Sequence, residues 1–330
     1  MLLDKVEYTK YDLEAIKILE DFIPDKICDA HAHFFDSDYL PKSHNHPVRT
    51  ITNMKSYKEA MVPILGNNKT IRANVIPFPD ATMGDYGSGN LLKSDAYVSE
   101  LIKENPENVY EIMVHPKESA EKIEKRLFSP RIRGLKCYYL LSDKPNCAQL
   151  PIGDYLSEGA WEVAQKHRLC ITLHLVKDEA LSAPENLSYI KEMSKRYPDA
   201  TLILAHCARA FAQWTGFEAV SEIAHLENVW YDFSAICESP VMYEILRKVG
   251  VDRCMWGSDF PVCLIRGRAI SVGKGFYWLG ENEKENIPNQ WTVGIENLFA
   301  VRQACKMLDF SPNQIEKFFW GSANNLWNFK

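Results

Sequence analysis

Short apolar runs alternate with amphipathic segments along nearly the whole chain. Eight of the apolar runs predict strands, and the segments between them repeat hydrophobic residues at helical spacing, as at Leu187, Ile190 and Met193. Strands that alternate with helices favour a parallel sheet, and eight such units can close into a barrel. We therefore expect an α/β fold, the (β/α)8 or TIM barrel. The predicted strands lie at about residues 27–33, 71–77, 109–115, 132–138, 169–175, 201–206, 229–234 and 253–258.

Two segments depart from this alternation, at about residues 34–70 and 260–300, where prolines or glycines are frequent. Each follows a run that ends in polar side chains, after the predicted strands 1 and 8. Insertions after barrel strands lie on the face that carries active sites, so we interpret both as lids or substrate walls. We expect one domain over residues 1–330, with a helical lead-in over 1–26 and closing helices over 295–330.

Side chains that can bind metals end several of the apolar runs. His31 and His33 end the first run, and on a regular strand they point to the same side, together with Asp29. The same pattern is repeated on three later runs, which end in His174, His206 and Asp259.

These polar ends predict one shared site. A metal ligand in mid-core would carry an uncompensated desolvation cost, whereas the carboxyl ends of barrel strands meet at a mouth that solvent can reach. Imidazole and carboxylate ligands suit Zn2+, although Mn2+ or Fe2+ would also fit. We expect one divalent metal ion, with zinc as the first choice.

Composition and charge exclude several classes of protein. The net charge is −6 and no basic tract tracks a phosphate backbone, so we expect no nucleic-acid partner. No apolar stretch approaches the roughly 20 residues of a spanning helix, and the first residues lack the apolar core of a secretion signal. Nine cysteines without paired spacing predict buried thiols. We expect a soluble, cytoplasmic protein whose partner is a small molecule.

Three motifs resemble the amidohydrolase superfamily, in particular its amidohydrolase-related (amidohydrolase 2) group. The resemblance covers nearly the whole chain and is specific for the superfamily, not for a substrate. The closing segment Gly321-Ser322-Ala323-Asn324-Asn325-Leu326 is also similar to the end of proteins in that group. The three motifs are Asp29-Ala30-His31-Ala32-His33-Phe34, Leu204-Ala205-His206-Cys207 and Trp256-Gly257-Ser258-Asp259-Phe260-Pro261.

The resemblance implies roles for these residues. His31, His33, His174 and Asp259 would bind one divalent metal, and His206 would bind metal or act on substrate. Asp259 would take the proton of a water activated by the metal, while the metal polarises a carbonyl. The implied chemistry is hydrolysis, and proteins of this group are often dimers.

Lys136 lies on the predicted fourth strand and has two readings. Some members of the family carry a carboxylated lysine there, which bridges a second metal ion. The alternative is a cation at the barrel mouth that binds an anionic substrate or pairs with Asp259, because a buried lysine needs a partner.

Other polar residues could also reach the site. Arg209, three residues beyond His206, could bind a substrate carboxylate through its two parallel donors, or form a surface salt bridge. Tyr138 stands where a loop could meet substrate. Glu238, Arg266 and Arg268 also stand where loops could meet substrate, and His115 could contact substrate or a ligand. We expect His44 and His46 in a solvated loop. We expect His167 and His225 in helices.

Three functions fit these observations. The first is a metal-dependent hydrolase that acts on a small, carboxylated lactone, ester or amide. The second is a metal-dependent non-oxidative decarboxylase of the same group, which would release carbon dioxide without consuming water. The third is a catalytically silent barrel that binds a metabolite, because fold alone does not prove activity.

Overall fold

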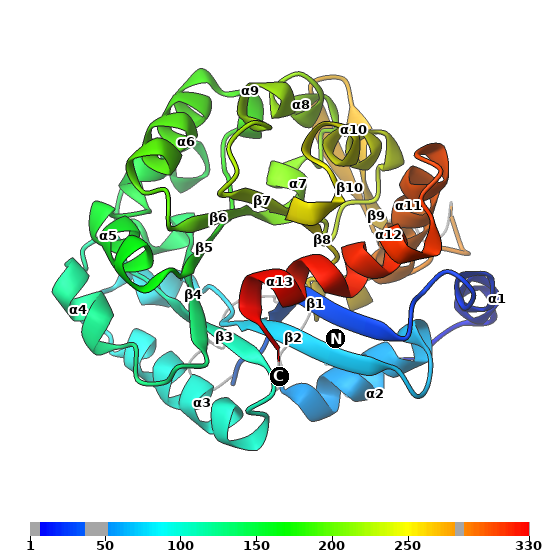
Figure 1. The fold of residues 1–330 in the computed structure, drawn as a ribbon, viewed down its shortest axis with the longest axis horizontal. Coiled ribbons are helices and arrows are strands. Elements are labelled where there is room, and N and C mark those ends of the chain that lie inside the picture. Colours follow the sequence, from blue (N-terminus) through cyan, green and yellow to red (C-terminus); the bar gives the residue numbers. More distant parts are fainter. Residues whose placement is uncertain (1–6, 37–51, 281–286, 330) are drawn as a thin grey trace.

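Eight parallel strands form one sheet in the computed structural model, which describes residues 7–36, 52–280 and 287–329. The strands follow one another around the sheet in sequence order, with the helices outside them (Figure 1). They are β1 (Lys26–His33), β2 (Thr70–Ile76), β3 (Val109–Met113), β4 (Ile132–Cys137), β5 (Cys170–Leu173), β6 (Thr201–Leu204), β7 (Val229–Asp232) and β8 (Cys254–Met255).

Backbone hydrogen bonds join the last strand to the first. The amide of Ala30 donates to the carbonyl of Trp256 at 2.9 Å, and the amide of Asp259 donates to the carbonyl of His31 at 2.7 Å. His33 and Phe260 continue this pairing with a bond of 2.7 Å. The expected (β/α)8 barrel is confirmed, and its closure brings the first and last polar motifs together.

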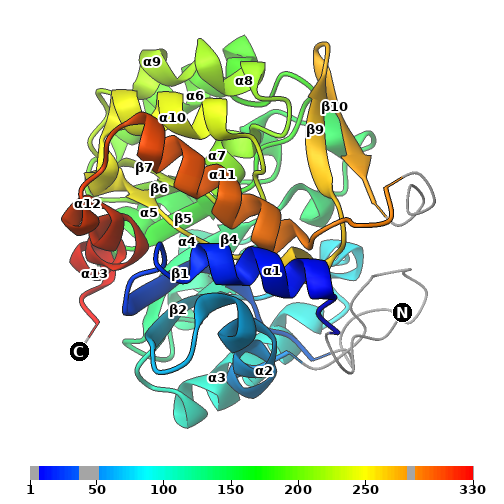
Figure 2. The same cartoon turned by 90° about the vertical axis from the view of Figure 1, so that its right-hand side faces the viewer.

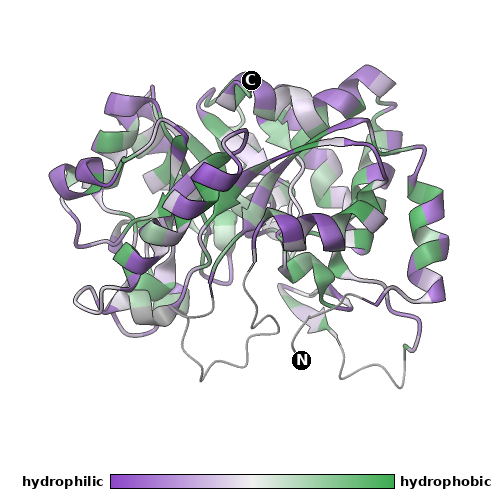
Figure 3. Ribbon diagram, turned by 90° about the horizontal axis from the view of Figure 1, so that it is seen from below, coloured by the Kyte–Doolittle hydropathy of each residue, from purple (hydrophilic) through white to green (hydrophobic). Residues whose placement is uncertain are grey.

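Some of the helices on the outside of the barrel begin at a side-chain cap. Asn53 and Ser56 form a capping box at the start of α2, and the Ser157 side chain accepts from the amide of Ala160 at the start of α5. The helices that follow the strands are α2 (Met54–Leu65), α3 (Asn90–Glu104), α4 (Ala120–Lys125), α5 (Glu158–His167), α6 (Pro184–Arg196), α8 (Trp214–Phe217), α9 (Val220–Ile223), α10 (Ser239–Val249) and α11 (Val293–Met307). The segment labelled α7 (Ala205–Arg209) is a turn with non-helical backbone angles. Hydrophobic residues gather on the strands, and hydrophilic ones on the outer helix surfaces (Figure 3).

The two irregular segments are shorter than the sequence predicts. Residues 54–65 form α2, an ordinary barrel helix, so only part of the segment 34–70 is inserted. The predicted insertion at 260–300 contains an antiparallel hairpin, β9 (Arg268–Val272) and β10 (Gly275–Leu279), before α11 begins. His44 and His46 lie outside the described residues.

The two ends of the barrel are covered differently. A lead-in helix, α1 (Lys10–Leu19), precedes β1, and α12 (Pro312–Glu316), a π-helical turn (Lys317–Gly321) and α13 (Ser322–Trp327) follow α11. The α13 segment lies across the barrel end that faces the viewer in Figure 1, where Trp327 and Phe329 pack against Cys28, Ala30 and Met255. The β9–β10 hairpin projects from the opposite side (Figure 2).

The cysteines and helices agree with two further expectations. All nine cysteines are free, and eight of them are buried. None of the helices in the described residues combines the length and hydropathy that a bilayer crossing requires.

Candidate active site

A bulge in β1 turns His31 and His33 into the barrel. The register with β2 shifts between Asp29 and Ala32, so the strand does not alternate regularly there. Asp29 therefore points away from the two histidines, and its carboxylate accepts from the Tyr57 hydroxyl on α2 and the amide of Ser258, both at 2.8 Å. The expectation that Asp29 shares their face is wrong, because it assumed an unbroken strand.

His31, His33 and Asp259 form a compact cluster at the carboxyl ends of β1 and β8. The Nε2 atoms of the two histidines are 3.2 Å apart, and Asp259 Oδ1 lies 3.3 Å from His33 Nε2 and 3.7 Å from His31 Nε2. All three residues are buried.

The other ring nitrogens show where the protons are. His31 Nδ1 is 2.9 Å from Asp232 Oδ2, and His33 Nδ1 is 3.3 Å from the carbonyl oxygens of Ile76 and Pro77. A carboxylate oxygen only accepts, so His31 carries its proton on Nδ1 and offers the lone pair of Nε2 to the cluster. His33 has acceptor oxygens near both ring nitrogens, the two carbonyls at Nδ1 and Asp259 Oδ1 at Nε2.

The donor set fits a divalent cation. Burial lowers the pKa of His31 to about 4, although Asp232 opposes the shift, so the ring is neutral near pH 7. Burial alone would raise the pKa of Asp259, but His206, His33 and His31 together hold it below its usual range. Two imidazole nitrogens and a carboxylate oxygen within 4 Å of one another are a typical zinc or manganese environment.

Gly257 allows this close approach of β8 to its neighbours. A Cβ atom at position 257 would lie 2.9 Å from the Cβ of His31 and 3.2 Å from the Cβ of Ser234. Asp259 follows with a φ of 59°. The sequence Trp256-Gly257-Ser258-Asp259 therefore positions the carboxylate by close packing and a left-handed backbone.

His206 stands in an unusual turn after β6. Four consecutive residues, His206, Cys207, Ala208 and Arg209, have φ between 51° and 61°, the left-handed region. The amide of His206 donates to Asp232 Oδ1 at 3.2 Å, and its ring centroid is 5.0 Å from those of His31 and His174. The predicted strand 201–206 thus ends at Leu204, and the turn directs His206 to the barrel mouth.

A cavity of about 150 Å3 lies over these residues. Its polar lining comprises His31, His33, Lys136, His174, His206 and Asp259, and its aromatic lining comprises Phe78, Tyr138, Phe211 and Trp278. All of the predicted metal ligands and Lys136 therefore meet in one place, as does Tyr138. Trp278 belongs to β10, so the hairpin forms one wall of the cavity.

Two predicted site residues take less central positions. His174 lines the cavity but belongs to neither of the three-residue clusters whose ligand atoms lie within 4.8 Å of one another in the described chain. Arg209 lies outside the cavity lining. Its Nη1 donates to the carbonyl of Lys177 at 2.9 Å, and its guanidinium sits 5.6 Å from the centre of the Phe276 ring.

Beneath the cavity, Lys136 adjoins a buried polar group that the sequence analysis missed. Glu111 Oε1 accepts from the Thr172 hydroxyl at 2.6 Å and from the Asn74 amide at 2.7 Å. Burial raises the pKa of Glu111 to about 7. Burial lowers the pKa of Lys136, while the negative charges of Glu111 and Asp232 oppose that shift. No carboxylate oxygen of the described residues lies within 4 Å of the Lys136 ammonium, so it does not form the predicted pair with Asp259.

Asp232 and Ser234 are further site residues that the sequence analysis missed. Both are fully buried at the end of β7, and Asp232 contacts His31 and His206. A signal was present, because Asp232 and Ser234 alternate on one face of a predicted strand that ends at the barrel mouth.

The remaining candidates have structural partners away from the cavity lining. His115 Nε2 lies 3.2 Å from the carbonyl of Gly84, and its Nδ1 accepts from the amide of Lys117. The base of the hairpin is held by Arg266, which pairs with Asp12, and by Arg268, which pairs with Glu238 and Glu296. His167 ends α5 and contacts Glu124, whereas His225 lies in a turn after α9 and not in a helix.

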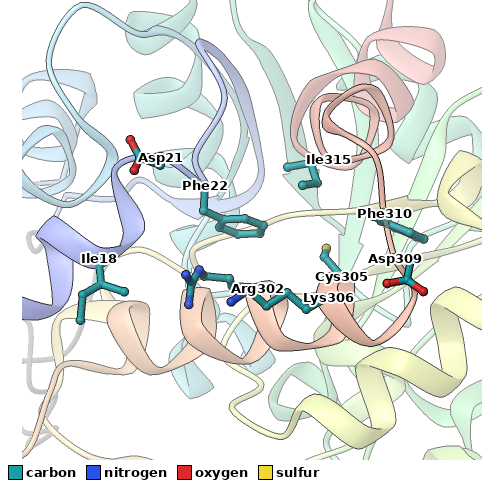
Figure 4. Close-up of a pocket in the computed structure, with 9 residues that line it drawn as sticks. All are labelled: Ile18, Asp21, Phe22, Arg302, Cys305, Lys306, Asp309, Phe310 and Ile315. Carbon is teal, nitrogen blue, oxygen red and sulfur yellow. The ribbon is translucent and has the colours of Figure 1, made fainter.

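A larger pocket of about 480 Å3 lies elsewhere, between α1, α11 and α12 (Figure 4). Phe22, Cys305, Phe310 and Ile315 provide its apolar lining, and Arg302 and Lys306 are on α11. It contains none of the residues around the His31 cluster, so the volume of a pocket does not locate the site here.

Solved structures with the same fold include proteins that are named as hydrolases and decarboxylases. A zinc-bound amidohydrolase from Burkholderia multivorans superimposes with a TM-score of 0.61 at 14% identity, over 92% of this chain and 99% of that one. A putative 2-pyrone-4,6-dicarboxylic acid hydrolase from Pseudomonas putida gives 0.59 at 14% identity, over 93% and 99%. A manganese-bound dihydroxybenzoic acid decarboxylase from a Polaromonas species gives 0.54 at 12% identity, over 92% and 97%.

Sequence comparison identifies the family of this chain. None of the curated proteins matches this chain. The model of the amidohydrolase family, however, matches residues 28–329, from β1 to the end of the described chain, and so includes every residue of the cavity. With the barrel closed and the motifs gathered at its mouth, this match over most of the sequence shows that the chain belongs to the amidohydrolase family.

Proposed function

We propose that the protein is a metal-dependent hydrolase acting on a small, carboxylated lactone, ester or amide. The observation that carries the proposal is the pair of Nε2 atoms, 3.2 Å apart, beside the Asp259 carboxylate at the floor of a small cavity. Membership of the amidohydrolase family supports the same reading. The proposed partner is a small anionic molecule.

His31, His33 and Asp259 would hold the metal ion, with His174 as a proposed fourth ligand at the same cavity. When bound there, a divalent cation would acidify a water molecule and polarise a substrate carbonyl. Zinc is the proposed ion because of the imidazole ligands, and manganese or iron would suit the carboxylate. The relatives bind zinc in one case and manganese in another.

The protein's own groups would then move the proton and hold the substrate. The Asp259 carboxylate, which its neighbouring histidines keep ionised, would accept a proton from water and return it to the leaving group. Lys136 would attract a substrate carboxylate into the cavity, and the rings of Phe211 and Trp278 would pack against a flat substrate. A volume of about 150 Å3 favours a molecule of a single ring or smaller.

Decarboxylation is the second candidate. The specific observation that favours it is the aromatic lining beside Lys136, because Phe211 and Trp278 can pack against an aromatic ring whose carboxylate the lysine binds. In that reaction the bond to the carboxyl carbon breaks, carbon dioxide leaves and a cavity acid protonates the remaining carbon. The structural likeness to a dihydroxybenzoic acid decarboxylase supports keeping this alternative.

The two reactions can be separated with one set of assays in water enriched in oxygen-18. The zinc- and manganese-loaded protein would be incubated with 2-pyrone-4,6-dicarboxylate and with dihydroxybenzoate, and with simple carboxylated lactones. Hydrolysis places one oxygen-18 atom in the organic product, whereas decarboxylation releases carbon dioxide and leaves the organic product unlabelled. Asp259→Asn serves as the matched control. Tight binding of a compound with no turnover by either metal form would favour the silent binding barrel and overturn the proposal.

A further inference from the structure

Asp232 connects two histidines of the site and has no assigned role. Its Oδ2 atom is 2.9 Å from His31 Nδ1. Its Oδ1 atom accepts from the amides of Ser234 and His206, at 3.1 and 3.2 Å, and from the Ser234 hydroxyl. Both oxygens of this buried carboxylate are therefore occupied by hydrogen-bond donors.

This arrangement makes Asp232 a poor metal ligand. Asp232, His31 and His206 have ligand atoms close enough to suggest an ion site of their own. His31, however, faces Asp232 with Nδ1 and faces His33 and Asp259 with Nε2, on the other edge of the ring. An ion held by Nε2 cannot lie between Nδ1 and Asp232, where a proton already forms the hydrogen bond.

Ser234 makes the corresponding contact with His206. Its hydroxyl donates to Asp232, so its oxygen is left to accept from His206 Nδ1 at 2.9 Å. The carbonyl oxygen of Ser234, which can only accept, lies 3.2 Å from the same nitrogen. Two acceptors on one ring nitrogen require that this nitrogen carries the proton.

We infer that Asp232 and Ser234 form a positioning unit at the carboxyl end of β7 that fixes both His31 and His206 as the tautomer with a free Nε2. Asp232 acts on His31 directly and on His206 through Ser234. One carboxylate thus orients a metal-cluster histidine and a second cavity histidine at once, in the manner of outer carboxylates that orient metal-binding imidazoles.

The unit limits what His206 can do in the cavity. In this tautomer the Nδ1 hydrogen is engaged by Ser234, so Nε2 offers the cavity a lone pair and no hydrogen-bond donor. His206 can accept a proton or bind a cation, and it does not donate to a substrate carbonyl until it has been protonated. This reading of its role rests on the proposed function, whereas the tautomer itself does not.

The tautomers can be measured in the metal-free protein by nitrogen-15 NMR of selectively labelled histidine, using the two-bond couplings from ring protons to each nitrogen. We expect His31 and His206 to carry the proton on Nδ1. His115 provides an internal reference of the opposite kind, because its Nδ1 accepts from the amide of Lys117 and its Nε2 donates to Gly84. Single histidine substitutions assign the signals.

Two variants test the unit itself. Ser234→Ala removes the hydroxyl, so the His206 signals should shift or broaden as the ring loosens, while those of His31 and His115 stay unchanged. The side-chain amide of Asp232→Asn has only one oxygen, so it cannot accept hydrogen bonds at both positions. Its NH2 group faces either His31 Nδ1 or the donors of Ser234 and His206. We expect at least one of the two histidines to change tautomer, and zinc affinity to fall by about 10- to 100-fold.

The outcomes are decisive in both directions. A wild-type His206 with its proton on Nε2 would overturn the inference, and this result needs no variant to fold. Unchanged His31 and His206 signals in a folded Asp232→Asn protein would overturn it as well. Because no substrate is involved, a protein that fails every hydrolysis assay but shows the expected tautomers would refute the proposed function alone.

Discussion

His31 and His33 face each other through their Nε2 atoms, which are 3.2 Å apart. Each ring turns its Nδ1 atom to a different part of the barrel, His31 to the end of β7 and His33 to the carbonyls that follow β2. The two Nε2 atoms are thereby directed to one point beside the Asp259 carboxylate. The backbone therefore holds ready a site that a metal ion would complete.

Replacing His31 should abolish this site. We expect His31→Ala to lower zinc affinity by more than about 100-fold, the upper range for substitutions that only support a ligand. Metal content per chain, measured by plasma mass spectrometry after dialysis, checks the result. His167→Ala is the matched control, because this partly exposed histidine contacts Glu124 on the surface and should leave the metal content unchanged.

His174→Ala tests the ligand with the weaker geometry. His174 lines the cavity but stands outside the cluster of His31, His33 and Asp259. If it is the fourth ligand, its loss should also reduce metal content under the same conditions. Full occupancy in this variant would remove His174 from the proposed ligand set and leave it as a wall of the cavity.

Asp259→Asn should damage turnover more than folding. Asparagine adopts the φ of 59° seen at this position more readily than most residues, so the backbone should not change. Loss of the proton acceptor should lower kcat by about 10²- to 10⁴-fold. The free energy of unfolding should change by less than about 1 kcal/mol. A variant with wild-type kcat would exclude Asp259 as the group that takes the proton.

Lys136→Ala separates one metal ion from two. If Lys136 is a cavity cation, the protein should hold about one ion per chain, and the variant should hold the same number with a higher KM for anionic substrates. Nearly two ions in the wild type, falling in the variant, would instead mean a carboxylated lysine. The same mass-spectrometric measurement, with stoichiometry referred to protein concentration, decides between them.

Glu111 should make stability depend on pH. Its folded-state pKa of about 7 exceeds the ordinary value of 4.5, so between these values the folded protein binds the proton more tightly than the unfolded chain. The contribution of this group is thus fully present below about pH 4.5 and is lost as the pH rises through 7. Relative to wild type, Glu111→Gln should gain on the order of 2–3 kcal/mol in unfolding free energy between pH 5 and 8.

Urea unfolding at several pH values, with chelator present, checks this difference. The matched control is Glu121→Gln, since Glu121 is an exposed carboxylate that pairs only with Lys125 on the surface of α4. Its curve should run parallel to the wild-type curve. A parallel curve for Glu111→Gln as well would mean that Glu111 titrates normally.

The sequence was sufficient for the barrel and for most of the residues that meet at its mouth. Eight apolar runs predicted eight strands, and histidines or aspartate at the ends of four of those segments reached one cavity. This succeeded because parallel strands of a barrel direct their carboxyl ends to one face. The position of Asp29 could not be predicted in this way, because a bulge inside β1 breaks the alternation.

The polar groups that support the ligands were harder to predict. Glu111 and Asp232 lie in mid-run or at the end of apolar strands, where a single carboxylate resembles an ordinary surface alternation. Their partners, Thr172 for Glu111 and His31 for Asp232, are distant in sequence and come close only when the barrel closes. The position of Arg209 could not be predicted either, because the turn after β6 directs its guanidinium to the carbonyl of Lys177, outside the cavity lining.

Heat should affect the left-handed turn at residues 206–209 before it affects the barrel. None of the four residues is glycine, and the left-handed conformation costs about 1–2 kcal/mol of conformational energy at each of them. The total is comparable with the net stability of a whole domain, about 5–15 kcal/mol, so tertiary contacts must hold the turn in place. Relaxation of the turn would carry His206 away from the cavity while the strands remain paired.

We therefore expect inactivation several degrees below the unfolding midpoint, seen by comparing the temperature dependence of turnover with that of circular dichroism. Ala208→Gly should narrow the gap, because glycine adopts the φ of 61° at this position without strain. Coincident curves for the wild type would mean that the turn and the barrel melt as one unit. If the gap is present, the working temperature of this protein is set by a loop of four residues, and stabilising the barrel further would not extend it.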